Sequence, residues 1–328
     1  MHPSSLYRFQ SFLLLILCFH WGNAKEVGRQ GADLGVLRVQ VPGFGPDGRL
    51  SWELRAREVR SLENEFYEAG NPLLKTYGKL GVRTEAKSSS GVFDLKVGHA
   101  FGKDVLFVVG EGFSAKGKKW KWWQKSAKGN HRMVFEEGGE LSFDMELGDF
   151  LLSRDFVDPK GCSDEPLEKD KTVPTVARAD FIELMAVNEK SHRFVLEGNV
   201  SVIGNELRLS CDKMEVKFDK DSNSSPSDFG EIAFITAVGK IEFAQKGRVS
   251  YCDVLRMDVA KGEVLLEGSE ESPAQVVDEE WGKASGDRIV LEKGKRRARV
   301  LSGKAGKRPS LVLPALPDLG FELKGKTP

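Results

Sequence analysis

The sequence has little of what metal, redox or nucleic-acid chemistry requires. It contains five histidines and four cysteines among 328 residues. The histidines stand at positions 2, 20, 99, 131 and 192, and no two have the spacing of metal ligands. Lysine plus arginine equals aspartate plus glutamate at 49 each, so no basic excess is available to attract a polyanion. We therefore expect no metal, no cofactor and no nucleic-acid partner.

Helical periodicity and catalytic acid clusters are also scarce. Nearly every segment is of strand length and ends at glycine or aspartate, and only residues 55–66 have a pattern that a helix would also satisfy. A catalytic pair of acids would form a cluster that occurs once, whereas the prominent aspartates recur at equivalent places. The chain is accordingly predicted to be all-β and not an enzyme.

An internal repeat between Ala179 and Gly303 organises the chain. Its first half is a small residue, an aspartate and then apolar residues at every second position, and its second half is apolar-x-apolar-x-Gly. Such alternation predicts strands with one buried and one solvated face. The first halves begin at Ala179, Cys211, Cys252 and Gly286, and the second halves at Phe194, Ile235, Val264 and, against the apolar rule, Arg299.

The repeat predicts an elongated pair of β layers around an apolar interior. A unit of roughly 30 to 40 residues with one apolar face cannot bury that face alone, so successive units must stack. The recurrent Asp180, Asp212, Asp253 and Asp287 are expected to support turns or backbone hydrogen bonds. The candidate interior residues are Ile182, Leu184, Phe194, Leu196, Met214, Val216, Ile235, Leu255, Met257, Leu266, Ile289 and Leu291.

The N-terminus has the layout of a secretory signal peptide. Arg8 precedes an apolar run from Phe12 to Phe19, and Gly22-Asn23-Ala24 provides a small-x-small cleavage site. The run is shorter than the roughly 20 residues that a membrane-spanning helix needs. We predict cleavage after Ala24 and export to the periplasm; the alternative is an uncleaved membrane anchor.

Export would place the remaining cysteines in an oxidising compartment. Cys162, Cys211 and Cys252 are an odd number, so they cannot all pair with one another. The last two occupy the repeat position of Ala179 and Gly286. They are interpreted either as small core residues or as a bridge between neighbouring repeat units.

Composition divides the chain into five parts. Residues 37–41 and 50–56 predict an N-terminal hairpin, and further strand-length segments follow. A segment rich in charge and proline then contains few large apolar residues, as expected of a linker. The predicted parts are a signal peptide at 1–24, a β-jellyroll domain at 36–152, a linker at 153–176, a second β-jellyroll domain at 177–303 and a basic, proline-containing tail at 304–328.

A stretch rich in tryptophan and lysine at residues 116–132 allows two interpretations. Period-two alternation places Trp120 and Trp122 on one face of a strand and Lys119 and Lys121 on the other. The stretch is either an edge strand that lysine keeps soluble over a tryptophan-filled core, or a surface that meets anionic lipid headgroups. Lys119 and Lys121 are the candidate headgroup contacts.

The repeat resembles the OstA-like domain of the LptA lipopolysaccharide-transport family, in which A-D-x-I, L-x-G-N-V and G-D-x-I elements recur along a β-jellyroll. The resemblance covers residues 176–303. Residues 36–152 more faintly resemble the related LptC domain, through Trp52-Glu53-Leu54-Arg55-Ala56 and Asn71-Pro72-Leu73. The elements that carry the OstA-like resemblance are Ala179-Asp180, Phe194 to Val200, Leu207 to Met214, Ala237 to Phe243 and Gly286-Asp287-Arg288-Ile289.

The resemblance implies two tandem open β-jellyrolls that carry lipopolysaccharide or a similar lipid toward the outer membrane. Acyl chains would lie in the apolar interior, where each methylene kept from water is worth about 0.8 kcal/mol. The implied partners are other Lpt-type jellyroll proteins, those of the inner-membrane exporter and the outer-membrane translocon, and further copies of the chain joined head to tail. The alternative function is a structural or surface β-solenoid that binds protein or glycan and carries no lipid.

Overall fold

A computed structural model describes much of the chain between residues 35 and 312. The predicted signal peptide, Cys162 and most of the predicted linker and tail lie outside the described residues. The described residues are 35–45, 47–62, 65–78, 81–94, 96–110, 112–124, 131–143, 174–187, 191–204, 207–219, 231–245, 247–278, 282–292, 298–301 and 310–312.

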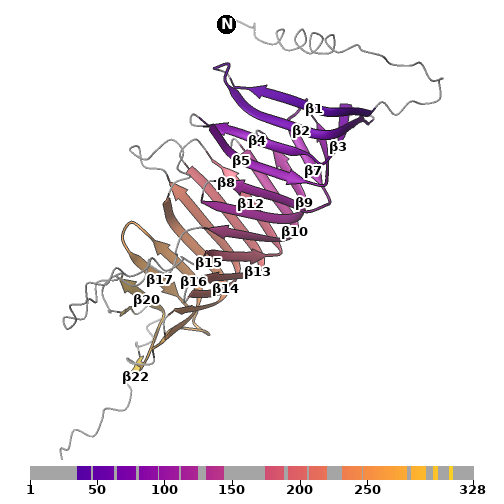
Figure 1. Ribbon diagram of the computed structural model, residues 1–328. Coiled ribbons are helices and arrows are strands. Elements are labelled where there is room, and N and C mark those ends of the chain that lie inside the picture. The colour runs from indigo at the N-terminus through magenta and orange to yellow at the C-terminus, as the bar shows by residue number, and fades with distance from the viewer. Residues whose placement is uncertain are drawn as a thin grey trace, which may run out of the picture. The chain divides into compact units, whose positions relative to one another are not determined.

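The elements found in the described residues are β-strands, and each strand pair is antiparallel (Figure 1). Of residues 55–66, the stretch with a pattern that a helix would also satisfy, residues 55–61 belong to β2 and Phe66 begins β3. Strands β1 and β2 form the predicted hairpin. The prediction of an all-β chain is confirmed. The first ten strands are β1 (Gly35–Phe44), β2 (Leu50–Ser61), β3 (Phe66–Gly70), β4 (Leu73–Gly78), β5 (Gly81–Ser88), β6 (Ser90–Asp94), β7 (His99–Gly102), β8 (Leu106–Gly110), β9 (Phe113–Trp123) and β10 (His131–Phe143).

The remaining strands begin at Thr175, so Thr175 and Val176 belong to a strand although the linker was predicted to extend to residue 176. Ser310–Val312, within the predicted tail, forms the last strand and pairs with β19. The strands are β11 (Thr175–Ala179), β12 (Phe181–Ala186), β13 (Ser191–Gly204), β14 (Leu207–Asp219), β15 (Glu231–Gln245), β16 (Arg248–Asp258), β17 (Glu263–Glu267), β18 (Ala274–Asp278), β19 (Gly282–Gly286), β20 (Arg288–Glu292), β21 (Ala298–Leu301) and β22 (Ser310–Val312).

Long strands contribute one half to each of two sheets. In β13, for example, residues 192–197 pair with residues of β12 and residues 201–203 pair with β11. Following these pairings, sheet I contains β4, β5, β8, β11, β18, β19 and β22. Sheet II contains β3, β6, β7, β12, β17, β20 and β21. The long strands β1, β2, β9, β10, β13, β14, β15 and β16 belong to both sheets.

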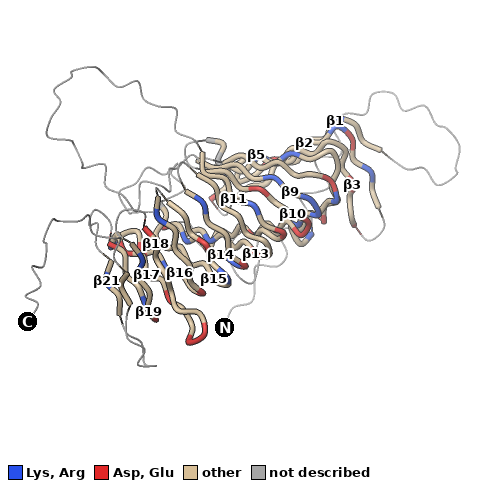
Figure 2. The backbone as a smooth tube through the Cα atoms, turned by 90° about the horizontal axis from the view of Figure 1, so that it is seen from below, with Lys and Arg blue, Asp and Glu red and all other residues tan. Residues whose placement is uncertain are grey.

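Backbone pairing continues across the sequence interval assigned to the linker. Strand β10, before this interval, pairs with both β11 and β12, which follow it. Gly139 lies opposite Ala179 in sheet I, and Phe135 lies opposite Ile182 in sheet II. The two sheets are therefore continuous through both predicted jellyroll domains, as Figure 1 and Figure 2 show from two directions for the successive strands.

The repeated aspartates lie where a long strand passes from one sheet to the other. Gly198 and Asn199 have φ angles of 76° and 46°, which bend β13 at that place. The Asn199 side-chain amide donates a hydrogen bond to Asp180 Oδ2 at 2.7 Å, and the Asp180 backbone N–H donates to the Gly198 carbonyl at 2.9 Å. The expected structural role of the repeated aspartate is confirmed at Asp180.

Candidate functional site

The twelve predicted interior residues form two rows along sheet II, and all twelve are buried. Within each row, members on neighbouring strands are direct register partners, and the gaps between them are filled by Ala237 and Val264. The first row is Ile182, Leu196, Met214, Ala237, Leu255, Leu266 and Ile289. The second row is Leu184, Phe194, Val216, Ile235, Met257, Val264 and Leu291.

Both rows continue into the N-terminal half of the chain. Ile182 lies opposite Phe135, which lies opposite Trp120, and Leu184 lies opposite Met133, which lies opposite Trp122. Trp120 and Trp122 are buried and belong to the same hydrophobic core as the repeat. Sequence reasoning placed the two tryptophans on one face but did not connect that face to the repeat, because the pairing of β10 with β12 joins segments about 50 residues apart.

Sheet I supplies a facing row in register. It contains one polar residue, Ser250, among the buried positions, and many of its members are small. Small side chains leave space opposite the larger residues of sheet II. The row is Leu54, Leu74, Ala86, Val108, Ala115, Leu141, Ala177, Val202, Leu209, Phe243, Ser250, Val276, Ala284 and Leu311.

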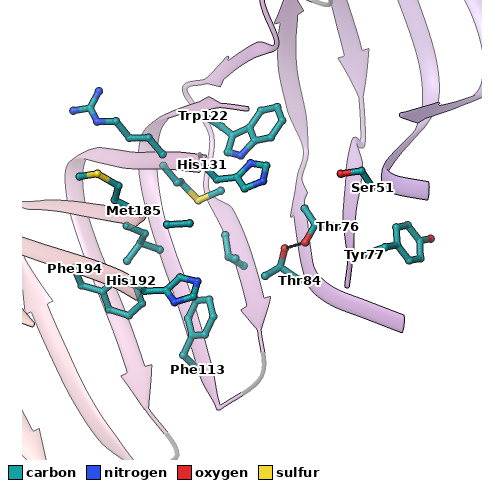
Figure 3. Close-up of a pocket in the computed structure, with 15 residues that line it drawn as sticks. Ser51, Thr76, Tyr77, Thr84, Phe113, Trp122, His131, Met185, His192 and Phe194 are labelled. Carbon is teal, nitrogen blue, oxygen red and sulfur yellow. Dashed lines mark hydrogen bonds between the residues drawn. The ribbon is translucent and has the colours of Figure 1, made fainter. Parts of the chain in front are cut away.

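A groove of about 140 Å³ lies between the sheets where the two predicted jellyroll domains adjoin, and Figure 3 shows its lining. The apolar part of the lining is Val108, Phe113, Trp122, Met133, Leu184 and Phe194. The polar part includes Thr76, Thr84, His131 and His192, and the two threonine hydroxyls are 2.5 Å apart. Of these lining residues, only Leu184 and Phe194 were predicted interior contacts.

A smaller apolar recess of about 20 Å³ shares Trp122 and Met133 with the groove. Its lining also includes Phe93, Leu106 and Trp120. The indole of Trp120 fits there because two neighbouring positions are glycine: a Cβ on Gly102 would lie 2.6 Å from the ring, and one on Gly91 would lie 3.0 Å from it. Glycine is therefore required by close approach, and a larger residue would displace the ring.

Four phenylalanines close one end of the groove; we call them the phenylalanine cluster. Phe113 and Phe143 are opposite one another in sheet I, and Phe194 and Phe218 belong to sheet II. Phe194 is central. The centroid of its ring is 5.9 Å from that of Phe113, 5.9 Å from that of Phe143 and 4.8 Å from that of Phe218. Because Phe113 and Phe194 also line the groove, the cluster is its end wall.

The candidate headgroup lysines lie on the outer face of sheet II. Lys119 Nζ is 2.8 Å from Glu137 Oε1, and Lys121 Nζ is 2.5 Å from Glu136 Oε1. The hydrogen bond from Lys119 lowers the pKa of Glu137, and Glu137 in turn raises the pKa of Lys119. Both ammonium groups therefore have carboxylate partners, and contact with lipid headgroups stays a prediction.

The outer face of sheet II also contains a buried apolar residue that alternation did not predict. Val195 is 3% exposed although it points away from the interior. It lies between Glu183 and Glu215, whose carboxylates pair with Arg132 and Arg193. The hydrogen bond from Arg193 lowers the pKa of Glu215. Long arginine side chains beside a valine reduce its exposure without placing it in the core.

Cys211 and Cys252 are free and buried. They lie on β14 and β16 with β15 between them, and Ile241 of β15 is opposite Cys252. Strands are about 4.8 Å apart, so residues two strands apart exceed the roughly 7 Å limit for a disulfide. Burial raises the pKa of each thiol to about 12. Of the two interpretations, the small core residue is the one that agrees with the structure.

The fourth repeat unit differs from its predicted phase by one residue. The sequence pattern aligned Arg299 and Leu301 with interior positions, but Ile289 lies opposite Val300 and Leu291 lies opposite Ala298. Arg299 instead pairs with Glu292 at 2.8 Å, and Leu301 is exposed. The arginine that broke the apolar rule is therefore on the outer face.

The described residues contain no cluster of three or more His, Cys, Asp or Glu side chains that could hold a metal ion. His99 stacks on Trp123 with ring centroids 5.0 Å apart, and burial lowers its pKa. His131 and His192 line the groove. No helix within the described ranges is long and apolar enough to cross a membrane.

Comparison with known proteins identifies the repeat region. Residues 183–306 match the family described as LptA/(LptD N-terminal domain) LPS transport protein. No curated protein matches the chain. Among solved structures, LptH, the LptA homologous periplasmic component of the lipopolysaccharide transport device of Pseudomonas aeruginosa, is similar at 18% identity and a TM-score of 0.32, over 43% of this chain and 95% of that one.

The matched family is one of transport proteins, in agreement with the prediction of a non-enzymatic chain. Residues 183–306 are therefore an LptA-like domain, as their repeat predicted.

Proposed function

We propose that this protein is a periplasmic lipid-transfer bridge, which carries lipopolysaccharide or a similar lipid toward the outer membrane by shielding acyl chains between sheets I and II. The observation that supports the proposal is the pair of apolar rows in sheet II, continuous in register over seven strands. Each methylene that leaves water for such a row gains about 0.8 kcal/mol. Because neighbouring positions in each row are chemically similar, an acyl chain moves along them without meeting a deep energy minimum.

Shielding requires the interior to open. Leu196, Leu255 and Leu266 have no exposed surface, so an acyl chain reaches them only when the sheets separate locally. The same burial is what a closed core would have. It is therefore the specific observation in favour of the alternative function, a structural β-solenoid without lipid cargo, and an experiment must distinguish the two.

Photo-crosslinking at adjacent positions of β13 makes that distinction. A crosslinker in place of Leu196 should capture lipid in living cells, because this side chain faces the interior. One in place of Glu197 should capture little, since its carboxylate is on the outer face, 2.5 Å from Lys213 Nζ. Val195 is the sharper control, because it is buried and apolar but outside the interior.

The outcomes separate the two functions. Lipid captured at 196 and not at 195 or 197 supports the bridge, and mass spectrometry of the captured species identifies lipopolysaccharide or another lipid. Equal capture at 195 and 196, or none at 196 in a folded variant, contradicts lipid carriage and favours the solenoid.

Location in the periplasm is part of the proposal. The predicted cleavage after Ala24 gives a mature chain that begins at Lys25. Intact-mass measurement of the protein from fractionated cells should find this N-terminus in the periplasmic fraction. Residues 1–24 retained in the membrane fraction would support the uncleaved anchor instead.

The free edge of strand β1 supports the proposal that partner proteins of the same architecture pair with this chain. Among the described strands, β1 pairs with β2 alone, and it exposes Val36, Leu37 and Phe44. Edge strands present unpaired backbone groups that accept a further strand. We propose that Lpt-type jellyroll proteins of the inner-membrane exporter and the outer-membrane translocon, and further copies of this chain, pair there.

Self-association provides a test of the β1 edge. Leu37→Glu, at a residue 71% exposed, should weaken concentration-dependent association by about tenfold in sedimentation experiments. Phe107→Glu changes an exposed apolar residue of β8, which has a partner strand on both sides, and should have no effect. Equal effects of the two variants would contradict pairing through β1.

A further inference from the structure

The phenylalanine cluster lies between the groove and the C-terminal part of the apolar rows, because Leu184 and Phe194 of the second row themselves line the groove. Sheet I lines the groove with residues of β2, β4, β5, β8 and the start of β9, and sheet II lines it with residues of the end of β9, β10, β12 and β13. Beyond the cluster, Val216, Ile235 and Met257 continue the second row of sheet II and are buried. An acyl chain in the groove would therefore meet the cluster before it meets these residues.

The size and lining of the groove suit the end of one acyl chain. A cavity of about 150 Å³ with apolar walls accommodates a molecule the size of benzene, and the groove has about 140 Å³. The recess beside Trp120 and Trp122 extends this apolar surface. A lipid with several chains would not fit without movement of the sheets, whereas one chain end would.

The polar residues of the groove suit the group that joins an acyl chain to its head. The Thr76 and Thr84 hydroxyls carry two hydrogens, and one of them lies between the two oxygens. The second hydrogen is available to an acceptor such as an ester or amide carbonyl. Figure 3 shows these hydroxyls across the groove from Trp122 and His131.

The phenylalanine cluster is placed where local opening is least costly. Phe113 is the first residue of β9, Phe143 the last of β10, and Phe218 the last but one of β14. Strand ends open at lower free energy than strand centres. The rings span from sheet I to sheet II through the contacts of Phe194 with Phe113 and Phe143, so their separation would open the interior toward β14.

We propose that the groove is the loading site for a single acyl chain and that the phenylalanine cluster is the barrier this chain displaces to reach the C-terminal half. This inference rests on the lipid-transfer function proposed above. It assigns the groove and the two rows different roles: the groove admits a chain end, and the rows beyond the cluster hold it in transit.

Two methionines in the same row provide matched reporters. Met133 lines the groove, and Met257 lies beyond the cluster in the second row of sheet II. A photo-crosslinker, p-benzoylphenylalanine, replaces one or the other in purified protein. The protein is mixed with palmitate, phosphatidylethanolamine or lipopolysaccharide, each alone and in competition, so that the source of the chain is identified. Capture should appear first at position 133 and later at 257.

Phe194→Leu tests the barrier, because leucine keeps the position apolar but removes the central ring. It should speed capture at position 257 about tenfold and leave capture at 133 unchanged. Phe218→Leu should have the same effect to a smaller degree, since Phe218 contacts the rings of Phe194 and Phe143 but does not line the groove. Phe234→Leu is the control: Phe234 is on the outer face of β15, 44% exposed and outside the cluster, and its loss should change neither rate.

The outcomes distinguish this inference from the function on which it rests. Capture at 257 that precedes capture at 133, or that is insensitive to both Phe194→Leu and Phe218→Leu, overturns the loading site and its barrier but leaves lipid carriage intact. Capture at neither position in the folded protein overturns both. Thermal unfolding of each variant establishes which samples are folded.

Discussion

The two halves of this molecule use the same pair of sheets in different ways. In the N-terminal half, sheet I presents Ala86, Val108 and Ala115 to the interior, and a groove remains opposite Trp122. In the C-terminal half, small residues such as Ala177 and Ser250 also face the interior, but Leu209 and Phe243, which lie between them on β14 and β15, are larger and buried. Backbone pairing is continuous through both halves, so side-chain volume distinguishes an accessible interior from a packed one.

The strands also differ between the halves. Before β9, the two sheets are built mostly from separate short strands, such as β3 and β4 or β5 and β6. In β13, β14, β15 and β16, single long strands pass through both sheets. Their bends at Gly198 and Gly239 lie beside Asp180 and Asp212. Asp180 and Asp212 thus lie where β13 and β15 pass from one sheet to the other.

A buried charge should reveal the largest difference between the halves. Leu255→Asp places a carboxylate at a residue with 0% exposure and should lower the free energy of unfolding by at least about 4 kcal/mol. Met133→Asp places one beside the groove, where water can reach it, and should cost about 2 kcal/mol. Urea titration measures both, and equal losses would mean that the groove is as closed as the packed half.

A glycine at a strand bend should give the next largest effect. Gly239→Ala combines a φ of +85° with a Cβ 2.2 Å from Asp212 Oδ2, and should cost about 3 kcal/mol. Gly112→Ala has a similar φ of +74° but meets nothing within 4 Å, so about 1 kcal/mol is expected. Asp212→Ser should recover part of the loss in the Gly239→Ala background only. Equal costs at the two glycines would exclude the aspartate contact as a cause.

The buried thiols should make the C-terminal half sensitive to alkaline pH. Each folded-state pKa is about 12, above the ordinary value of 9.0, so unfolded thiols ionise first as pH rises. Their contribution to stability is therefore complete below about pH 9 and is lost as pH rises toward about 12. The thermal midpoint of the natural protein should fall more steeply over this range than that of Cys211→Ala/Cys252→Ala. Parallel curves, or rapid native alkylation of either cysteine, would mean that the thiols are not buried.

The sequence was most informative where the chain repeats. Period-two alternation identified the two rows of sheet II, because every residue in them faces the same way over successive strands. It could not find the groove, which is lined jointly by residues of β4, β5 and β12, far apart in the chain. The alternation also misassigned the phase of the last repeat unit, because Arg299 and Leu301 have the same spacing of two residues but lie on the outer face. Side-chain volume on two separate strands decides where space remains, and alternation carries no information about volume.

The smallest effects are expected at the lysines on the outer face of the N-terminal half. Lys119 and Lys121 pair with Glu137 and Glu136, and about half of each side chain's surface is exposed to water. Exposed ion pairs contribute little to stability, so Lys119→Ala should leave the thermal midpoint unchanged within error.

As headgroup contacts, however, the ammonium groups of Lys119 and Lys121 would have to exchange glutamate for lipid phosphate. Glu136→Gln/Glu137→Gln removes the competing carboxylates and should strengthen binding to vesicles of anionic lipid several-fold at low salt. The gain should disappear at high salt, where screening is strong, and Lys119→Ala/Lys121→Ala should abolish it in the same background. If binding to anionic vesicles is the same in all these variants, the lysines serve only to keep the outer face soluble, and the two halves differ in their interiors alone.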